Sequence, residues 1–205
     1  MLYKKYFKVI LDYFFAFVLL LITMPIMLIV AILIKLDDPK NPILFKQDRP
    51  GKNARIFTLY KFRTMKIETE KDGKVLNDFQ RITKLGYYLR KMSIDELPQL
   101  INILKGEMSF IGPRPLLVEY LQHYTPYEMR RHDVKPGITG WAQVNGRNAI
   151  SWEQKFELDI WYIDNVSFKL DLKIIFLTII NVLKSEGINS TSNLTMPRFK
   201  ESESN

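Results

Sequence analysis

The run YFFAFVLLLITMPIMLIVAILI, from Tyr13 to Ile34, decides how this chain is built, because it carries no charged residue. As a helix, a run of this length measures roughly 33 Å and is long enough to cross the hydrocarbon core of a bilayer. Lys35 follows the run directly. A cleaved signal peptide is disfavoured, since the run is long and Met24-Pro25 offers no small-residue cleavage site.

Two alternatives remain for the way this run meets the membrane. Pro25 lies in its middle, where a proline removes a backbone hydrogen bond and favours a kink or a break. A spanning helix would place the basic N-terminal end and the basic main part of the chain on opposite sides, against the positive-inside rule. A re-entrant helix–break–helix would return both ends to one face, with Asp12 at headgroup depth and paired with Lys8 or Lys35. Many spanning helices contain proline, so the residues alone leave both arrangements open.

The composition limits the kinds of site and partner. The chain has 205 residues, of which 47% are hydrophobic and 25% are charged, so it can form a folded domain with a core. Its formal net charge of +8 favours anionic partners, namely nucleic acid, acidic lipid headgroups or phosphorylated substrates. The absence of cysteine excludes disulfides, thiolate zinc sites and cysteine nucleophiles, and only two histidines argue against a multi-histidine metal site.

Beyond the apolar run, the pattern predicts an α+β fold: a small β-hairpin followed by a mostly helical domain. Strands at 43–47 and 55–62 flank turn residues at 49–53. From Arg49 to Lys66 there are six basic residues and no acidic one, which suits a solvated hairpin face near anionic lipid, a phosphate-facing wall, or both. A polar loop at 66–80 follows, with a turn at 72–73, and a second turn-rich loop covers 136–140. Helices are predicted at 81–91, 95–104, 116–124, 126–133, 151–165 and 171–184.

The chain divides into three predicted parts. Residues 1–36 form the membrane segment with its break near Met24-Pro25, 37–187 the main domain, and 188–205 a polar, disordered tail. The helix at 171–184 is apolar almost all round but too short to span a bilayer. It is therefore either a core helix or a helix that lies in the membrane interface.

The stretch Met92-Ser93-Ile94-Asp95-Glu96-Leu97-Pro98 places two adjacent carboxylates at the predicted start of a helix. The simplest interpretation is a helix cap, because acidic residues complement the macrodipole and Ser93 to Glu96 fits a capping box. Pro98 is costly in the helix if Ser93 is the cap, and harmless if Asp95 is the cap. Either the helix begins at Asp95, or a tight turn precedes it.

A catalytic interpretation uses the same pair. A carboxylate can attack phosphorus and form an acyl phosphate, provided that cations, usually including Mg²⁺, neutralise the phosphoryl group. Asp95 is the candidate nucleophile and Glu96 the candidate Mg²⁺ ligand. Arg114, within the stiff turn Gly112-Pro113-Arg114-Pro115, and Arg147 are candidates to clamp phosphate bidentately.

Several further motifs accompany the carboxylate pair. In chain order the set is Gln47–Gly51, Tyr60–Met65, Ser93–Gln99, Met108–Pro115, and Lys135–Gly140 running into Gln143–Arg147. In this order and spacing, they resemble the motifs of the small monotopic bacterial phosphoglycosyl transferases, the PglC-like members of the bacterial sugar transferase family. The resemblance covers nearly the whole chain.

The resemblance implies a reaction and its site. The enzyme would move a phosphosugar, with an N-acetylated amino sugar as the expectation, from a UDP-sugar to polyprenol (undecaprenyl) phosphate. Asp95 would carry the covalent phosphosugar intermediate with release of UMP, and Mg²⁺ would be held by Glu96 and Asp95. The family's cationic substrate-binding positions fall on Lys61, Arg90, Arg114 and Arg147.

The resemblance also implies a location. It places the chain on the cytoplasmic face of the bacterial inner membrane as a monotopic protein, with a re-entrant helix, interfacial amphipathic helices and anionic lipids around it. Where the family has Ser-Pro at the break, this chain has Met24-Pro25. We expect the hydroxyl of Thr23 to replace that of the serine.

Two other functions are weighed against this one. A basic membrane-anchored module that binds nucleic acid or lipid would show strong salt dependence and no dependence on Asp95. The proline-glycine turn in its basic stretch suits a hairpin better than a groove reader, so nucleic acid is not expected as a partner. A membrane phosphatase would use the same acyl phosphate with water as the acceptor.

Overall fold

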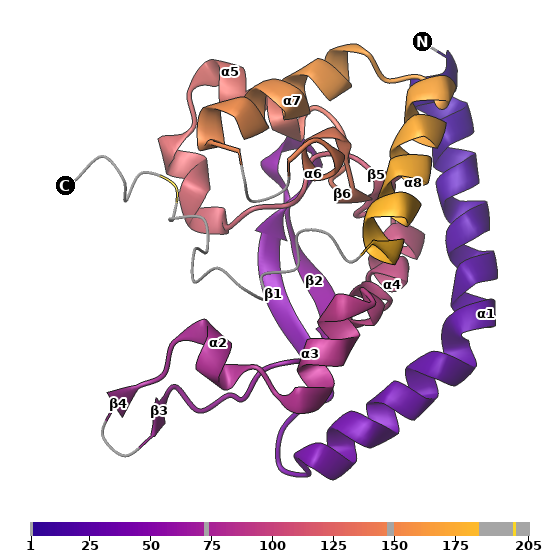
Figure 1. Ribbon diagram of the computed structural model, residues 1–205. Coiled ribbons are helices and arrows are strands. Elements are labelled where there is room, and N and C mark those ends of the chain that lie inside the picture. The colour runs from indigo at the N-terminus through magenta and orange to yellow at the C-terminus, as the bar shows by residue number, and fades with distance from the viewer. Residues whose placement is uncertain (1, 72–73, 147–149, 185–198, 200–205) are drawn as a thin grey trace.

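The computed structural model describes residues 2–71, 74–146, 150–184 and 199, which form an α+β fold dominated by helices (Figure 1). A long helix, α1 (Lys8–Asp37), runs along one side of a domain built from shorter elements. The described residues contain three two-stranded sheets. The other elements, with η for short 3₁₀ turns and for the π-helical η1, are η1 (Tyr3–Phe7), β1 (Leu44–Pro50), η2 (Lys52–Ala54), β2 (Ile56–Phe62), β3 (Glu70–Lys71), β4 (Lys74–Val75), α2 (Asp78–Arg81), α3 (Lys84–Lys91), η3 (Ile94–Glu96), α4 (Gln99–Leu104), β5 (Ser109–Ile111), η4 (Val118–His123), α5 (Pro126–Met129), η5 (Arg130–His132), β6 (Gly137–Thr139), α6 (Trp141–Val144), α7 (Trp152–Asp164) and α8 (Phe168–Leu183).

The helix α1 bends rather than breaks. It is continuous through Pro25, and the concave side of its bend faces the domain (Figure 1). Pro25 explains a bend, because it has no N–H to donate to the carbonyl of Leu21. Thr23 does not replace that bond, since its hydroxyl donates to the Leu19 carbonyl at 2.7 Å, a contact that itself favours bending. The segment Tyr3–Asp37 is long and apolar enough to cross a membrane.

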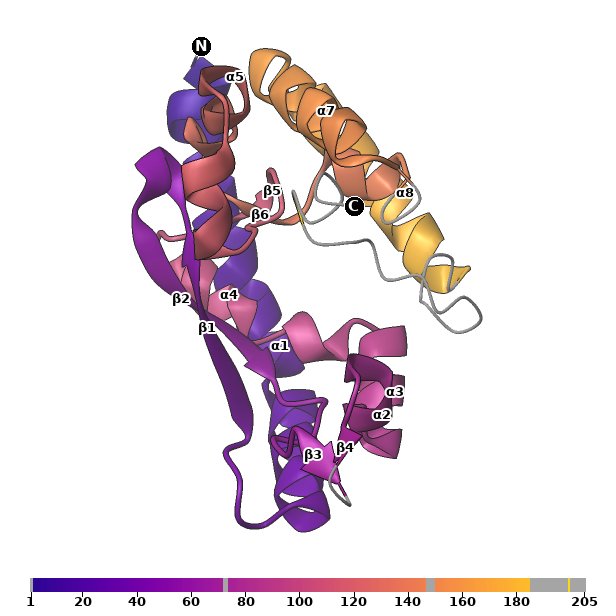
Figure 2. The same ribbon diagram turned by 90° about the vertical axis from the view of Figure 1, so that its left-hand side faces the viewer.

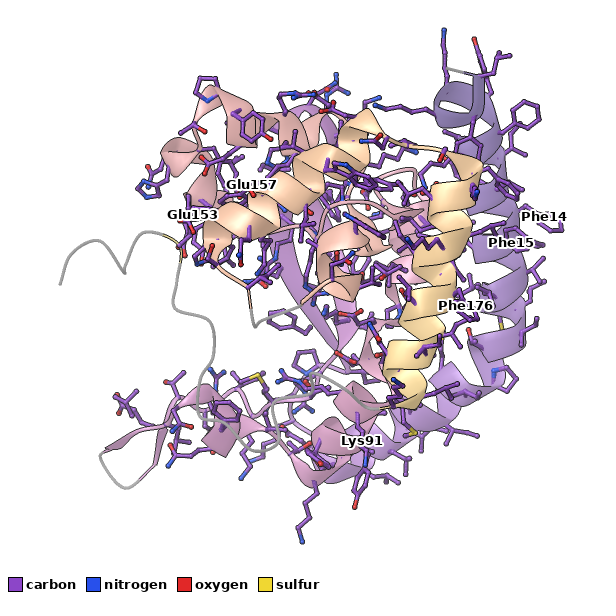
Figure 3. The ribbon with its side chains drawn as sticks, turned by 45° about the horizontal axis from the view of Figure 1, so that its top comes forward. Phe14, Phe15, Lys91, Glu153, Glu157 and Phe176 are labelled. Carbon is purple, nitrogen blue, oxygen red and sulfur yellow. The ribbon has the colours of Figure 1, made fainter. Side chains whose placement is uncertain are left out.

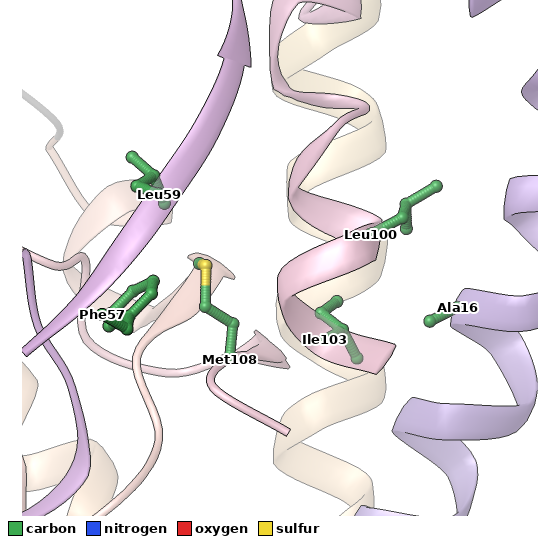
Figure 4. Close-up of a cluster of buried hydrophobic side chains, with 6 residues drawn as sticks. All are labelled: Ala16, Phe57, Leu59, Leu100, Ile103 and Met108. Carbon is green, nitrogen blue, oxygen red and sulfur yellow. The ribbon is translucent and has the colours of Figure 1, made fainter. Parts of the chain in front are cut away.

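Both halves of α1 pack on the domain. In the first half, Ala16 is fully buried against Leu100 and Ile103 of α4, in a cluster completed by Phe57, Leu59 and Met108 (Figure 4). In the second half, Val30 and Ile34 join a cluster with Phe62 and Leu89, from β2 and α3. The methyl side chain of Ala16 lets the two helices approach closely. The helix α1 is thus part of the core that supports α4.

Polar contacts fasten both ends of α1 to the same domain. Near its start, the Tyr3 hydroxyl and the Lys8 ammonium donate to the Asp171 carboxylate of α8 at 2.6 and 2.8 Å. Beyond its last turn, the Arg63 guanidinium donates to the Asp38 carboxylate at 2.8 Å. The two ends of the helix therefore lie on one body.

The prediction for Asp12 is correct only in part: the charge of Lys8 lowers the pKa of Asp12 against the larger, raising effect of burial, but Lys8 forms its ion pair with Asp171. We expected this carboxylate to pair with Lys8 or Lys35 among lipid headgroups. Asp12 is instead buried, with 8% of its surface exposed, and it accepts a hydrogen bond from the Phe110 backbone N–H at 3.2 Å. Lys35 donates to the Asn41 carbonyl at 3.3 Å. Asp12 thus contacts the domain through the Phe110 backbone.

The hairpin β1–β2 confirms the two predicted strands. Its antiparallel register places Phe45 opposite Lys61, Gln47 opposite Leu59 and Arg49 opposite Phe57. Residues directly opposite one another point to the same face of a sheet, and so do residues two apart. One face therefore carries two buried side chains of the core and also Lys61. Figure 2 shows this hairpin as a long twisted ribbon on one side of the domain.

Two predicted loops contain short strands. Residues 136–140 include β6, which pairs in parallel with β5, Ser109 opposite Gly137. This pairing joins segments far apart in the chain, so no local sequence pattern predicts it. The loop at 66–80 contains the small hairpin β3–β4 and the start of α2, and its turn at 72–73 lies outside the described residues.

The two C-terminal helices follow their predictions closely. Ser151 and Gln154 form the expected capping box at the start of α7. Large apolar side chains are exposed on both long helices (Figure 3). Phe176 of α8 has 63% of its surface exposed, and Phe14 and Phe15 of α1 have 58% and 49% exposed. The tail predicted from 188 lies outside the described residues, apart from one residue. That residue, Phe199, stacks edge-on against Tyr120 and Phe156.

Candidate active site

The carboxylate pair lies in a tight turn ahead of α4. Ser93 adopts the left-handed conformation, with φ of 55°, and turns the chain sharply after α3 into η3, which contains Asp95 and Glu96. Pro98 is the N-cap residue of α4, where its missing N–H costs no helical bond. Neither Ser93 nor Asp95 caps α4, so the two predicted helix caps do not form. Ser93 is instead the N-cap residue of η3, without a side-chain capping hydrogen bond, and this tight turn precedes the helix, as the third alternative had it. The pair is free of a capping role.

Core packing on both sides holds this turn in place. Ile94, just before the pair, packs on the cluster that contains Val30 and Ile34 of α1. Leu97, just after it, packs on the cluster that contains Ala16. The position of the two carboxylates thus depends on both halves of α1.

Glu96 is the better paired of the two carboxylates. Its Oε1 accepts from Lys61 Nζ at 2.5 Å and from Arg114 Nη2 at 3.1 Å. Burial opposes ionisation of Glu96, but the charges of Arg114 and Lys61 outweigh burial and lower its pKa to about 2. Burial also lowers the pKa of Lys61, and the charge of Glu96 partly restores it. Three sequence-predicted residues are thereby brought together.

Asp95 has a different environment, one residue away. Only 8% of its surface is exposed, and among residues 2–71, 74–146, 150–184 and 199 no donor hydrogen-bonds to its carboxylate. Burial raises its pKa, the charge of Lys61 lowers it, and the charge of Glu96 raises it again. A desolvated carboxylate that lacks hydrogen bonds is a stronger nucleophile than a fully bonded one.

Arg90 supports the site from α3. Its charge favours the ionised form of Asp95, and its Nε donates to the Thr64 hydroxyl at 2.8 Å. Gly86 lets α3 lie directly on this segment, because a Cβ there would meet the Thr64 carbonyl oxygen at 2.0 Å. Arg90 is therefore brought near the pair, as predicted. Thr64 was quoted only as part of a motif, and its contact with Arg90 was not predicted.

A buried ion pair holds the turn that carries Arg114. Arg131 donates to the Asp159 carboxylate at 2.7 Å, to the Arg114 backbone carbonyl at 2.9 Å and to the Tyr124 hydroxyl at 3.1 Å. Its guanidinium also lies over the Phe156 ring, 5.5 Å from the ring centre. The side chain of Arg114 itself is 48% exposed. The sequence offered no signal for this support, since Arg131 and Asp159 are far apart in the chain.

The donor set of the turn fits a magnesium ion. Mg²⁺ is held by one or two carboxylates, together with substrate phosphates and water. Asp95 and Glu96 supply that number, and the described part of the chain contains no group of three or more acidic or histidine ligands. Glu96 Oε1 is already shared by two cations, so Glu96 Oε2 and the Asp95 oxygens are the atoms that could face a metal. Arg147, the remaining predicted residue, lies outside the described residues.

The family profile described as bacterial sugar transferase matches residues 3–185. The uncharacterized sugar transferase EpsL of Bacillus subtilis is 62% identical over 159 residues, covering 78% of this chain and 79% of EpsL.

Two longer relatives carry more specific names. The UDP-N-acetylgalactosamine-undecaprenyl-phosphate N-acetylgalactosaminephosphotransferase of Aeromonas hydrophila is 44% identical over 80% of this chain and 40% of its own length. The UDP-glucose:undecaprenyl-phosphate glucose-1-phosphate transferase of Escherichia coli is 41% identical over 82% of this chain and 38% of its own length. The chain thus spans less than half of each of these two relatives.

Proposed function

The chain belongs to the bacterial sugar transferase family, and we propose that it moves a phosphosugar from a UDP-sugar to undecaprenyl phosphate. The observation that carries this proposal is the asymmetry of the carboxylate pair. Glu96 is held ionised by two cations, whereas Asp95 is buried without a hydrogen-bond donor in the described residues. This arrangement suits a nucleophile beside a charge-stabilised neighbour.

In the first step, an oxygen of the Asp95 carboxylate forms a bond to the phosphorus that bears the sugar. The bond from that phosphorus to the oxygen shared with the nucleotide breaks, and UMP leaves with the electron pair. Lys61, Arg90 and Arg114 lower the cost of bringing a carboxylate to an anionic phosphoryl group. The product of this step is an acyl phosphate on Asp95 that carries the sugar.

In the second step, an oxygen of undecaprenyl phosphate attacks the same phosphorus. The bond to Asp95 breaks, its carboxylate is regenerated, and undecaprenyl-diphosphate-sugar is formed. Two displacements at one phosphorus require no oxidant and no net transfer of a proton. Mg²⁺ bound to Asp95 and Glu96 would neutralise phosphate oxygens and strengthen the electrophile.

We place the chain on the cytoplasmic face of the inner membrane as a monotopic protein. Support comes from α1, because its two ends are fastened to one domain through Asp171 and Asp38. A helix that crossed the bilayer would carry these ends to opposite sides. The exposed apolar residues of α1 would then lie in lipid. The nearby carboxylate pair Asp95–Glu96, the dyad, could then meet both a soluble donor and a lipid-linked acceptor.

Mass spectrometry of the intact protein tests this function. The purified chain in nanodiscs is incubated with Mg²⁺ and UDP-glucose, UDP-N-acetylglucosamine or UDP-N-acetylgalactosamine. We expect release of UMP and a phosphosugar adduct on the peptide that contains Asp95, which disappears when undecaprenyl phosphate is added. An adduct on another residue would contradict the nucleophile assignment. Free sugar phosphate without a lipid product would instead indicate a phosphatase.

A further inference from the structure

Arg49 lies on the face of the hairpin that looks into the domain. It stands opposite Phe57, a buried core residue, and Lys61 stands further along the same face. Lys61 is paired with Phe45, four residues from Arg49, so the two cations are separated by roughly 13 Å along the strand direction. Arg49 begins the basic stretch from Arg49 to Lys66, for which the sequence offers a phosphate-facing wall as one interpretation, but it is not among the individually predicted site residues.

Arg49 has no acidic partner in the part of the chain that the structure describes. Its Nε is buried without a hydrogen-bond acceptor, and its Nη2 donates only to the neutral Gln47 side chain, at 2.5 Å. Glu119, Tyr120 and Tyr124 face it and favour its charge, but none of them forms an ion pair with it. A desolvated guanidinium that forms no ion pair is an unfavourable arrangement for folding alone.

A second cation adds to this cost. Arg114 and Pro50, the neighbour of Arg49, line one small cavity with Arg131 and His132. Burial, and then the charge of Arg114, lower the pKa of Arg49 to about 10. Two like charges that act on each other in a partly buried place attract an anion strongly.

We propose that Arg49 and Arg114 form a second phosphate subsite, on the hairpin side of the dyad. The subsite rests on the proposed function for its ligand, which is a phosphate group of one of the two substrates. Arg114 connects the carboxylate pair to Arg49, since it contacts Glu96 at 3.1 Å and its charge also acts on Arg49. A phosphate at Arg49 would thus be held at the same time as a phosphate at the dyad.

The test compares Arg49→Gln with Arg49→Lys and with the control Lys46→Gln. Lys46 is exposed on the opposite face of the same strand, facing Tyr60. Calorimetry measures binding of UMP and of dodecyl phosphate to the full chain, and kinetics give the KM of each substrate. For Arg49→Gln we expect about tenfold to hundredfold weaker binding of one ligand, partial recovery in Arg49→Lys and no change in Lys46→Gln.

The two sources of phosphate give different results. Weaker UMP binding with a raised KM for UDP-sugar places the nucleotide phosphate at Arg49. Weaker dodecyl phosphate binding with a raised KM for undecaprenyl phosphate places the acceptor phosphate there. A structural role is separated by thermal unfolding, because removing an unpaired charge should leave the Tm unchanged or higher.

Equal binding of both ligands by Arg49→Gln and the wild type would overturn the subsite, and so would a lower Tm with unchanged KM values. Failure of the proposed function looks different. In that case the wild type makes no lipid-linked product, while the loss of phosphate binding in Arg49→Gln persists.

Discussion

Two groups of charged side chains meet at Arg114 and are built in opposite ways. Behind its backbone, Arg131 and Asp159 form a pair of equal and opposite charge, with 1% and 2% of their side chains exposed. In front of it, the dyad turn gathers cations around its two carboxylates and leaves Asp95 without a hydrogen-bond donor among the described residues. The comparison teaches that the charges supporting the fold are neutralised internally, whereas those in the site remain in positive excess for an anionic substrate.

The largest expected effect comes from the charged group around Asp95 and Glu96. Asp95→Asn should lower kcat by about 10⁴-fold or more, since an amide cannot form the acyl phosphate. Burial raises the pKa of Asp95, so the folded chain disfavours its ionised form at neutral pH. The Tm of the variant should therefore be unchanged or higher. UMP release and thermal unfolding in nanodiscs measure the two effects.

Full turnover by Asp95→Asn would contradict the nucleophile assignment. A large fall in Tm would contradict the view that Asp95 is kept for chemistry rather than for stability. The matched control is Asp164→Asn, which neutralises an exposed carboxylate at the end of α7 and should alter neither quantity appreciably.

For the Arg131–Asp159 pair, we expect the larger effect on the stability of the fold rather than on kcat. Asp159→Asn leaves Arg131 buried without its counter-ion, and should lower the free energy of unfolding by about 3–5 kcal/mol. Denaturant unfolding in detergent measures this loss. The double variant Arg131→Met/Asp159→Leu should recover much of the stability, because it removes both charges. If it instead remains as unstable as the single variant, the pair is not the source of the loss.

Glu96→Gln should lower kcat/KM by about 10²-fold, because Lys61 and Arg114 lose the charge that orients them. It should also change the acid stability of the fold. The pKa of Glu96 is lowered from 4.5 to about 2, so its contribution is fully present above pH 4.5 and is lost as the pH falls toward 2. Between about pH 5 and pH 2, the free energy of unfolding should therefore fall less steeply in Glu96→Gln than in the wild type. Parallel curves for both proteins would contradict this.

The smallest effect concerns the pH profile of kcat/KM. The reaction needs ionised Asp95 and protonated Lys61, and burial raises the first pKa and lowers the second. We expect a bell-shaped profile whose acid limb lies above 3.8 and whose basic limb lies below 10.5. In Lys61→Arg, the basic limb should move upward, since a guanidinium keeps its proton. An unchanged basic limb would assign it to another group.

Local signals account for the parts of the fold that were predicted correctly. The hairpin has turn residues between two short strands, and α7 has a capping box at Ser151, so each is readable over a few residues. The helix caps predicted at Ser93 and Asp95 do not form, because a tight turn with Ser93 in the left-handed conformation precedes α4, and residues of this turn pack on the core clusters at both sides. Propensity is a weak guide where tertiary contacts decide.

The candidate site shows the same division. The family resemblance implied Lys61, Arg90 and Arg114, of which Arg114 was also suggested by its stiff turn, and the structure brings them to the carboxylate pair. The contacts that support the site were not predicted, since Thr64 and Arg131 act through partners distant in sequence.

By itself, the sequence determined the apolar run, the order of the elements and the residue types of the site, because these follow from composition and short-range pattern. Only the tertiary structure decided that α1 bends without a break and that Asp12 faces the domain. It also decided that the neighbouring Asp95 and Glu96 receive opposite environments. The physical reason is that burial and charge pairing depend on residues brought together across the chain, which no local pattern records.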